Sequence, residues 1–108
     1  KRVAGLLEQA KLPQRVIVDC SHANSGKDHM RQPVVASEIA TAIAQGNHSV
    51  MGVMMESFLV DGRQEHRPGE PLTYGQSITD ACLSWERTEP IFEIFAKAVQ
   101  ERRSGTKL

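Results

Sequence analysis

Two short apolar stretches of this chain each stop abruptly at an ionisable side chain, and this pattern constrains the fold more than any other feature. Residues 16–20 are rich in β-branched side chains and lead into His22, and residues 50–55 are apolar throughout and stop at Glu56. Stretches of this length and composition are typical of buried strands. Because side chains alternate along a strand, positions 16, 18, 20 and 22 share one face, as do positions 50, 52, 54 and 56. This places His22 and Glu56 on the core-facing side at the carboxyl end of a parallel sheet, where α/β proteins commonly carry out chemistry.

Helical patterns flank the two expected strands. The spacing of apolar residues over 3–10 predicts the end of a helix, which Pro13 prevents from continuing. Residues 32–45 carry apolar side chains at helical spacing, with Pro33 near the start and Gly46 just past the end, and they predict a second helix. The second strand is then expected over residues 49–56.

The second half of the chain is expected to contain one long loop and one helix. Residues 60–75 are polar and contain several glycine and proline turn signals, which predict a loop with a small hairpin. A last helix is expected over 89–102, with Thr88 as its N-cap and Pro90 in its first turn. Because strands alternate with helices along the chain, we expect parallel strands, right-handed crossovers and an α/β fold with two βα units.

Length, charge and cysteine content limit the classes of function. With 108 residues, 40% of them hydrophobic, the chain suffices for one small core, and because it starts at Lys1 we expect it to be a piece of a longer protein. Thirteen basic and thirteen acidic residues give no net charge, so no nucleic acid partner is expected. No apolar run approaches the roughly 20 residues that cross a bilayer, so no membrane association is expected. Two cysteines without a short repeated spacing favour a reducing, cytoplasmic setting.

Three side chains, His22, Glu56 and Asp80, form the candidate site. A histidine at a strand end can be a metal ligand or a hydrogen-bonded structural residue. A carboxylate directly after an apolar strand, such as Glu56, is costly to bury without a cation or a hydrogen-bond partner. Asp80 can be a third ligand, or it can complete a helix-capping pattern that begins at Ser77. A mixed imidazole and carboxylate site suits manganese, iron, cobalt or zinc better than calcium.

Three segments resemble, in order and spacing, the type I 3-deoxy-7-phosphoheptulonate synthase (DAHP synthase) family. They are residues 19–27 (DCSHANSGK), 52–57 (GVMMES) and 74–82 (YGQSITDAC), followed by Trp85-Glu86. The resemblance covers nearly the whole chain. It implies that residues 1–108 are the C-terminal part, about the last two βα units, of a (β/α)8 TIM barrel. They would then be one segment of a single catalytic domain that is incomplete without upstream residues.

The resemblance also implies the metal ligands. In that family a cysteine, a histidine, a glutamate and an aspartate hold a divalent ion, and the last three map to His22, Glu56 and Asp80. The family's cysteine lies upstream and matches neither Cys20 nor Cys82. Cys20 could in principle bind metal in this chain, but a small thiol packed in the core is the expected role, and Cys82 is expected to be structural.

The reaction implied by the resemblance is a transferase reaction of aromatic amino acid biosynthesis. Phosphoenolpyruvate condenses with erythrose 4-phosphate to give 3-deoxy-D-arabino-heptulosonate 7-phosphate and phosphate, the first step of the shikimate pathway towards chorismate. The metal would activate the sugar aldehyde, and His22 would be catalytic by positioning phosphoenolpyruvate or water beside it. Such substrates need several basic groups, but Lys27, Arg31 and Arg63 are scattered and expected to be solvated, so most phosphate-binding residues should lie upstream.

Two further expectations follow from the resemblance. The family implies a homo-oligomer, a dimer or tetramer, in the full-length enzyme, and the 108-residue chain alone is expected to be inactive. The alternative is a non-catalytic metal-binding or interaction module derived from this barrel.

Overall fold

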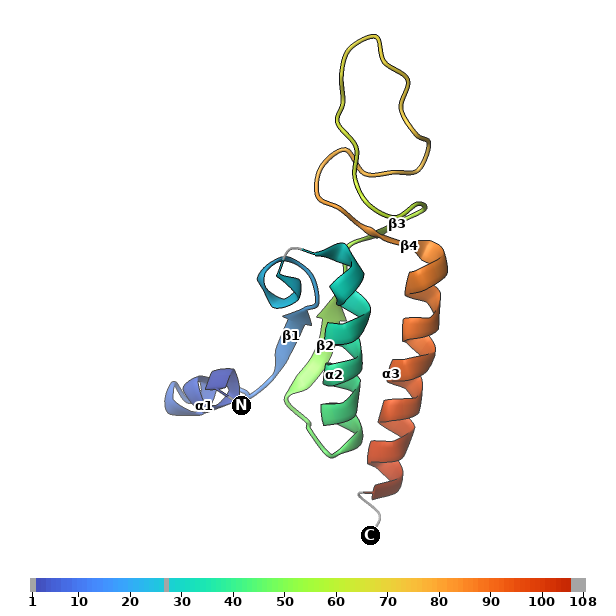
Figure 1. The fold of residues 1–108 in the computed structure, drawn as a ribbon. Helices are drawn as coiled ribbons and strands as arrows, with labels where there is room; N and C mark the ends of the chain where they lie inside the picture. The colour runs from blue at the N-terminus through green and yellow to red at the C-terminus, as the bar shows by residue number, and fades with distance from the viewer. Residues whose placement is uncertain (1, 27, 106–108) are drawn as a thin grey trace.

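The computed structural model describes residues 2–26 and 28–105 and shows a mixed arrangement of helices and parallel strands (Figure 1). The elements follow one another as α1 (Arg2–Gln9), β1 (Val16–Asp19), the 3-10 helices η1 (His22–Ser25) and η2 (His29–Arg31), α2 (Gln32–Ala44), β2 (Val50–Met54), β3 (Ser57–Phe58), β4 (Leu83–Ser84) and α3 (Trp85–Gly105). The two expected strands and the first two expected helices are confirmed to within a few residues. No helix among the described residues is long and apolar enough to cross a membrane.

The strands β1 and β2 pair in parallel, as the alternation of strands and helices predicted. The helix α2 connects them, because parallel neighbours need a crossover to return the chain to the same end of the sheet. The pairing is irregular between Val16 and Ile17, and beyond this irregularity Asp19 lies opposite Met54. The carboxyl ends of both strands therefore lie at the same edge of the sheet.

The helices α2 and α3 lie side by side and cover one face of the strand pair (Figure 1). Apolar side chains of both helices pack against the strands, because burying them removes their surface from water. The buried hydrophobic residues are Cys20, Val35, Ala36, Ala40, Ile43, Leu83, Ile91 and Ala98. Three partly buried side chains in or next to β2 pack against this core: Val50, Val53 and Met55.

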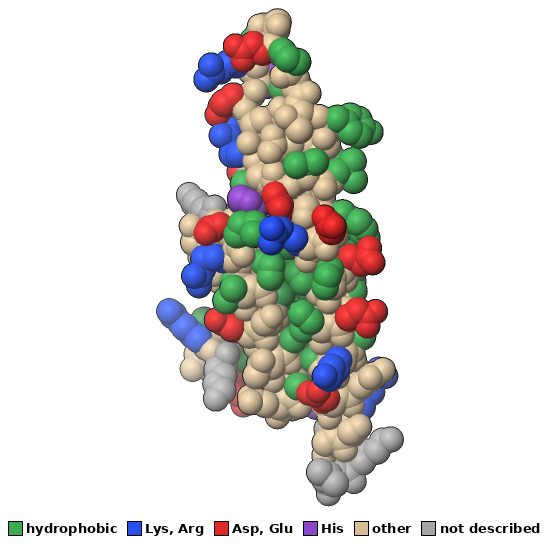
Figure 2. Space-filling view, turned by 45° about the vertical axis from the view of Figure 1, so that its right-hand side comes forward, with side chains coloured by type: hydrophobic (Ala, Val, Ile, Leu, Met, Phe, Trp, Pro, Cys, Tyr) green, Lys and Arg blue, Asp and Glu red, His purple; other side chains and the backbone are tan. Residues whose placement is uncertain are grey.

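The other face of the strand pair is uncovered. Ile17 of β1 is 66% exposed, and Met54 of β2, which lies opposite Asp19 and therefore faces the same side as Ile17, is 43% exposed. The described chain measures 60 × 31 × 17 Å, and its radius of gyration of 16.9 Å exceeds the roughly 13 Å expected for a compact domain of this length. On the face shown in Figure 2, hydrophobic side chains also reach the surface in the middle of the molecule, bordered by charged ones.

The helix α3 begins at Trp85, four residues before the start expected from the sequence. The hydroxyl of Ser84 accepts the backbone N–H of Arg87 at 3.3 Å, and the carboxylate of Asp61 accepts the backbone N–H of Ser84 at 2.7 Å. Thr88 is therefore not the N-cap; it is buried inside the helix and donates its hydroxyl hydrogen to the Ser84 carbonyl at 2.8 Å. Pro90 consequently lies within the helix and not in its first turn.

The long segment between β3 and β4 is a loop, as predicted, but the hairpin expected in it does not form. Among the described residues, 60–75 contain no strand, and only isolated bridges join Gly62 to Cys82 and Arg63 to Ser77. The side chain of Gln64 holds the loop closed: its amide donates to the carbonyls of Thr73 at 2.8 Å and Gln76 at 2.9 Å. The loop projects beyond the carboxyl ends of β1 and β2 (Figure 1).

Candidate metal centre

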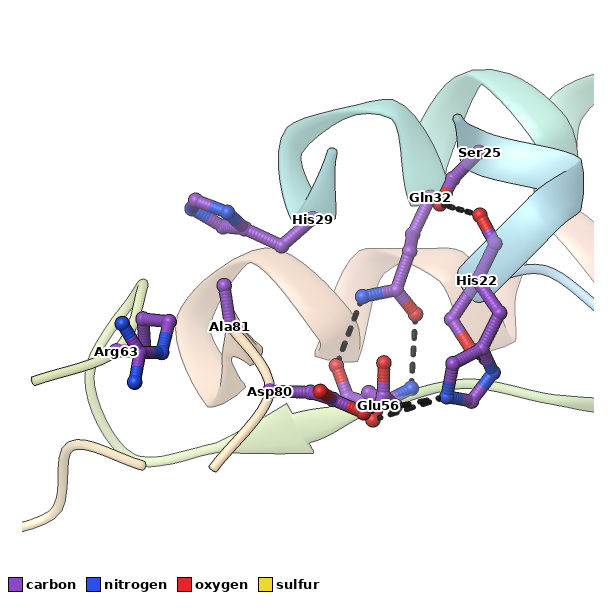
Figure 3. Close-up of a pocket in the computed structure, with 9 residues that line it drawn as sticks. His22, Ser25, His29, Gln32, Glu56, Arg63, Asp80 and Ala81 are labelled. Carbon is purple, nitrogen blue, oxygen red and sulfur yellow. Dashed lines mark hydrogen bonds and ion pairs between the residues drawn. The ribbon is translucent and has the colours of Figure 1, made fainter. Parts of the chain in front are cut away.

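Three side chains singled out in the sequence converge just beyond β1 and β2. His22 begins η1, Glu56 follows β2, and Asp80 lies in the segment before β4. The Nε2 atom of His22 lies 3.5 Å from Oε2 of Glu56 and 3.3 Å from Oδ2 of Asp80 (Figure 3). One ligand atom from each residue can be chosen so that all three lie within 4.8 Å of one another. One cation could contact all three side chains after small rotamer changes.

His22 lies next to Glu56 in the structure, but not because β1 continues as far as His22, as the sequence suggested. The strand β1 ends at Asp19, and Cys20 points into the core beside Val35 and Leu83. If the strand had continued, His22 would share the face of Cys20 and point toward the helices. The chain turns instead, and His22 adopts a φ of 51°, in the left-handed region that is uncommon for residues other than glycine. The expectation that His22 lies on an extension of the strand was wrong, although the two side chains do meet.

Asp19 contacts the nitrogen of His22 that faces away from Glu56. The Oδ2 atom of Asp19 lies 2.7 Å from Nδ1 of His22, and Oδ1 accepts the backbone N–H of Ser21 at 2.8 Å and also its hydroxyl. Hydrogen bonds from Ser21 and His22 hold the pKa of Asp19 below its ordinary value. The hydrogen bond to Asp19, with smaller contributions from Glu56 and Asp80, raises the pKa of His22. Asp19 was not among the candidate site residues expected from the sequence, although it lies only three residues before His22.

Glu56 is held through its backbone by a buried glutamine. Gln32, in the first turn of α2, is fully buried; its Nε2 donates to the Glu56 carbonyl at 2.9 Å, and its Oε1 accepts the Glu56 N–H at 2.8 Å. Partial burial raises the pKa of the Glu56 carboxyl, and the negative charges of Asp80 and Asp19 act in the same direction, against the influence of His22. A cation at this position would relieve the repulsion between these carboxylates.

Asp80 does not cap a helix. The residues after it lead into β4, and the hydroxyl of Ser77 accepts the N–H of Thr79 at 3.1 Å in a local turn. The alternative role of Asp80, completion of a capping pattern that begins at Ser77, is therefore wrong, because the next helix begins only at Trp85. Asp80 reaches His22 from a segment that Arg63 supports: the Nε atom of Arg63 donates to the Thr79 carbonyl at 2.7 Å.

A pocket of about 310 Å³ opens beside the three side chains (Figure 3). It is lined by Ser21, His22, Ser25, His29, Gln32, Glu56, Arg63, Asp80 and Ala81. Arg63, which was expected to be a solvated loop residue, thus lines the pocket, and its guanidinium also pairs with Glu65 at 2.9 Å. Arg31 is exposed, as expected, and Lys27 lies outside the described residues. One end of the pocket is acidic and Arg63 lies toward the other.

Neither cysteine belongs to this cluster. Cys20 is fully buried in the core, and burial raises the pKa of its thiol. Cys82 is partly buried, its sulfur lies 3.5 Å from the Asp80 carbonyl, and burial likewise raises the pKa of its thiol. Both are free thiols, and within the described residues only His22, Glu56 and Asp80 form a group with metal-ligand spacing.

Comparisons with known proteins give a consistent result. Residues 1–93 match the family model described as the DAHP synthetase I family. The chain is 50% identical over 105 residues to the tyrosine-inhibited phospho-2-dehydro-3-deoxyheptonate aldolase of Schizosaccharomyces pombe, covering 94% of this chain and 28% of that protein. It is 47% identical over 97 residues to the Phe-sensitive enzyme of the same name from Escherichia coli K12, covering 90% of this chain and 28% of that protein.

A solved structure of the same kind matches the fold. The phospho-2-dehydro-3-deoxyheptonate aldolase of Francisella tularensis SCHU S4 aligns with a TM-score of 0.84 and 44% sequence identity, over 91% of this chain and 28% of that one. The chain therefore spans about 28% of the length of each of these three relatives.

Proposed function

Because the chain belongs to the DAHP synthetase I family, we propose that it supplies part of the active site of a 3-deoxy-7-phosphoheptulonate synthase. The reaction proposed is the condensation of phosphoenolpyruvate with erythrose 4-phosphate and water, which gives 3-deoxy-D-arabino-heptulosonate 7-phosphate and phosphate. The observation that carries this proposal is the convergence of His22, Glu56 and Asp80 beside a pocket, at the carboxyl ends of two parallel strands. The family match gives this convergence a chemical meaning that the geometry alone would not have.

The donor set of these three residues fits a divalent transition metal. One imidazole nitrogen and two carboxylate oxygens suit manganese, iron, cobalt or zinc, whereas calcium prefers more oxygen ligands. The raised pKa of Glu56 reflects burial and the neighbouring carboxylates, a repulsion that a cation would offset. A metal ion bound here would act as a Lewis acid on the carbonyl oxygen of the aldehyde substrate.

The residues of this chain would orient the ligands and hold one wall of the pocket. Gln32 fixes the backbone of Glu56, and Arg63 fixes the backbone next to Asp80. His22 presents Nε2 to both carboxylates and would also lie beside any molecule that enters the pocket. We propose that His22 contributes to catalysis in this way, by positioning substrate or water next to the metal site.

Two phosphorylated substrates require more positive charge than this chain provides near the site. Among the described lysine and arginine side chains, Arg63 is the one that lines the pocket. Guanidinium groups match phosphate oxygens well, so Arg63 could take part in phosphate binding. The remaining phosphate-binding groups would come from residues outside this chain.

We further propose that residues 1–108 form about the last two βα units of a (β/α)8 barrel. The parallel pairing of β1 with β2, the helices on one face only and the exposed Ile17 and Met54 on the other face support this placement. The inner face of such a barrel is packed with branched side chains from neighbouring strands. Ile17 would find its packing partners there.

The test is the activity and metal content of the full-length protein that carries this chain. We expect it to consume phosphoenolpyruvate only when erythrose 4-phosphate is present, and to lose this activity on chelation of its metal. Glu56→Gln keeps the side-chain volume but removes a ligand charge, so we expect activity to fall by at least about 100-fold. The matched control is Glu38→Gln, since Glu38 is exposed on α2 and does not line the pocket.

Asp80→Asn tests the second carboxylate. Asparagine can make most of the hydrogen bonds of aspartate but is a poorer metal ligand, so activity and metal content should fall while the fold is kept. Normal activity and full metal content in both the Glu56 and the Asp80 variants would contradict the proposed site. Tight metal binding without any condensation activity in the wild-type protein would favour the non-catalytic alternative.

A further inference from the structure

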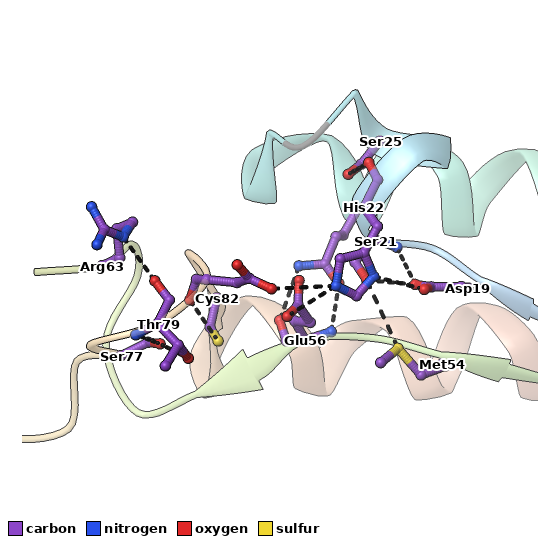
Figure 4. A network of polar contacts seen from close by, with 12 residues as sticks. Asp19, Ser21, His22, Ser25, Met54, Glu56, Arg63, Ser77, Thr79 and Cys82 are labelled. Atoms are coloured by element: carbon purple, nitrogen blue, oxygen red, sulfur yellow. Dashed lines mark hydrogen bonds and ion pairs between the residues drawn. The ribbon is translucent and has the colours of Figure 1, made fainter.

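Asp19 and Glu56 lie on opposite sides of the His22 ring (Figure 4), and Asp80 contacts the same ring nitrogen as Glu56. The Oδ2 atom of Asp19 lies 2.7 Å from Nδ1. On the other side, Nε2 lies 3.5 Å from Glu56 and 3.3 Å from Asp80. Each ring nitrogen therefore faces its own carboxylate partners, and the position of the ring hydrogen decides which side receives a hydrogen bond.

A neutral imidazole carries its hydrogen on one nitrogen only, and an ionised carboxylate can only accept hydrogen bonds. The 2.7 Å contact is favourable when the hydrogen is on Nδ1, because Asp19 then accepts it. The lone pair of Nε2 is then directed toward Glu56 and Asp80. With the hydrogen on Nε2 instead, two lone pairs would meet at Asp19, and Nε2 could donate to a carboxylate but not bind a metal.

Asp19 is itself firmly held. It is the last residue of β1, and its partner in the register with β2 is Met54. Its Oδ1 accepts the backbone N–H of Ser21, which is 2% exposed, and its own carbonyl accepts the side-chain amide of Asn24 at 2.7 Å. The Ser21 hydroxyl lies 2.9 Å from Nδ1 of His22 and also bonds to Asp19, so the turn and the carboxylate support each other.

We propose that Asp19 is a positioning residue for the metal site: it fixes the tautomer and orientation of His22 so that Nε2 is the ligand atom. Metal-bound histidines commonly donate their second N–H to a carboxylate, which raises their basicity and fixes the ring. The proposal rests on the proposed function for the presence of a metal. The tautomer, however, can be measured without any metal.

The first experiment measures that tautomer in the metal-free, full-length protein labelled with ¹⁵N-histidine. At a pH where the ring is neutral, the two ring-nitrogen chemical shifts show which nitrogen carries the hydrogen, and the spectrum of His22→Gln assigns the signals. We expect the hydrogen on Nδ1 in the wild-type protein and a shift toward Nε2 in Asp19→Ala. A wild-type hydrogen on Nε2, or an unchanged tautomer in the variant, would overturn the proposal.

The second experiment measures the dissociation constant for Mn²⁺ and the visible spectrum of the Co²⁺-loaded protein. Asp19→Ala should weaken Mn²⁺ binding by about 10- to 100-fold and change the Co²⁺ bands, as expected on loss of a ligand's carboxylate partner. Asp19→Asn should lose less, because its amide oxygen can still accept the Nδ1 hydrogen. If Asp19→Ala does not fold, the Mn²⁺ dissociation constant of Asp19→Asn tests the role of Asp19 instead.

The control for both experiments is Asp28→Ala. The Asp28 carboxylate accepts the N–H of Met30 at 3.0 Å and caps a neighbouring 3-10 helix, so its removal perturbs the same region without touching His22. An equal loss of Mn²⁺ binding in the Asp19 and Asp28 variants would show that Asp19 acts only through local stability. A wild-type protein that binds no metal would refute the proposed function, and the tautomer measurement would still decide the role of Asp19.

Discussion

The side-chain amide of Gln32 forms two hydrogen bonds with the backbone of Glu56, one to its carbonyl and one from its N–H. Gln32 is fully buried at the start of α2, and Glu56 follows β2. A helix and a strand end that are distant in the sequence are thereby fixed to each other. The carboxylate of Glu56 can take up a defined position because its backbone cannot move independently of α2.

Gln32→Met should destabilise the protein and weaken its metal binding. Methionine has nearly the same volume but cannot hydrogen-bond, so the N–H of Glu56 would lose its partner, whereas the Glu56 carbonyl would keep the N–H of Leu83 at 2.9 Å. We expect the free energy of unfolding to fall by about 1 to 3 kcal/mol, the usual cost of one unsatisfied buried group. Urea denaturation and Mn²⁺ titration of the full-length protein measure the two effects. Gln45→Met, at an exposed position after α2, should change neither.

The strands and helices could be predicted because their signals are local. Apolar runs, helical spacing, Pro33 and Gly46 are all read within one segment, and β1, β2 and α2 lie where these signals placed them. The start of α3 could not be predicted in this way. It depends on Asp61, which bonds to the N–H of Ser84 across the long loop.

The candidate site was predictable in its residues but not in its geometry. Alternation along a continuous strand grouped His22 with Cys20, but the strand ends at Asp19 and the chain then turns. In the observed register Asp19 lies opposite Met54, so these two side chains, and not that of Cys20, point to the same face of the strand pair. A strand ends where local hydrogen bonds from side chains compete with the backbone hydrogen bonds to the neighbouring strand. Here the side chain of Asp19 accepts a local hydrogen bond from the backbone N–H of Ser21.

Asp61 should stabilise the protein in a pH-dependent way. Burial alone would raise the pKa of Asp61, but hydrogen bonds from the Ser84 N–H and the Arg87 guanidinium lower it overall. A carboxyl group with a lowered pKa in the folded state contributes stability above its unfolded pKa of about 4, and this contribution is lost as the pH falls through the folded value.

The corresponding variant is Asp61→Asn. We expect a loss of about 0.5 to 1 kcal/mol in the free energy of unfolding at pH 7, because the site is partly exposed and the charge is screened. The difference from wild type should shrink below about pH 4. Urea denaturation at several pH values tests this, with Glu70→Gln in the same loop as control. A difference that stays constant with pH would show that the charge of Asp61 does not matter.

Cys20 should be a core residue and not a ligand. Its thiol is fully buried against Val35 and Leu83, and burial raises its pKa, so it should react slowly with alkylating reagents in the native protein. Cys20→Ala should lower stability by about 1 to 2 kcal/mol through a small cavity and leave the Mn²⁺ dissociation constant unchanged. A large loss of Mn²⁺ affinity in this variant, at preserved stability, would instead identify Cys20 as a metal ligand.

Arg63 should act on the metal site through the segment that carries Asp80. Its Nε donates to the carbonyl of Thr79, the residue before Asp80, and its Nη1 pairs with Glu65, so the guanidinium connects two parts of the loop. Arg63→Gln removes this support, and we expect the Mn²⁺ dissociation constant to rise about tenfold, at the low end for residues that hold ligands in place. The control is Arg67→Gln, because Arg67 lies in the same loop but does not line the pocket. If Arg63→Gln left Mn²⁺ binding unchanged but raised the KM for one phosphorylated substrate, Arg63 would be a substrate contact and not a support for Asp80.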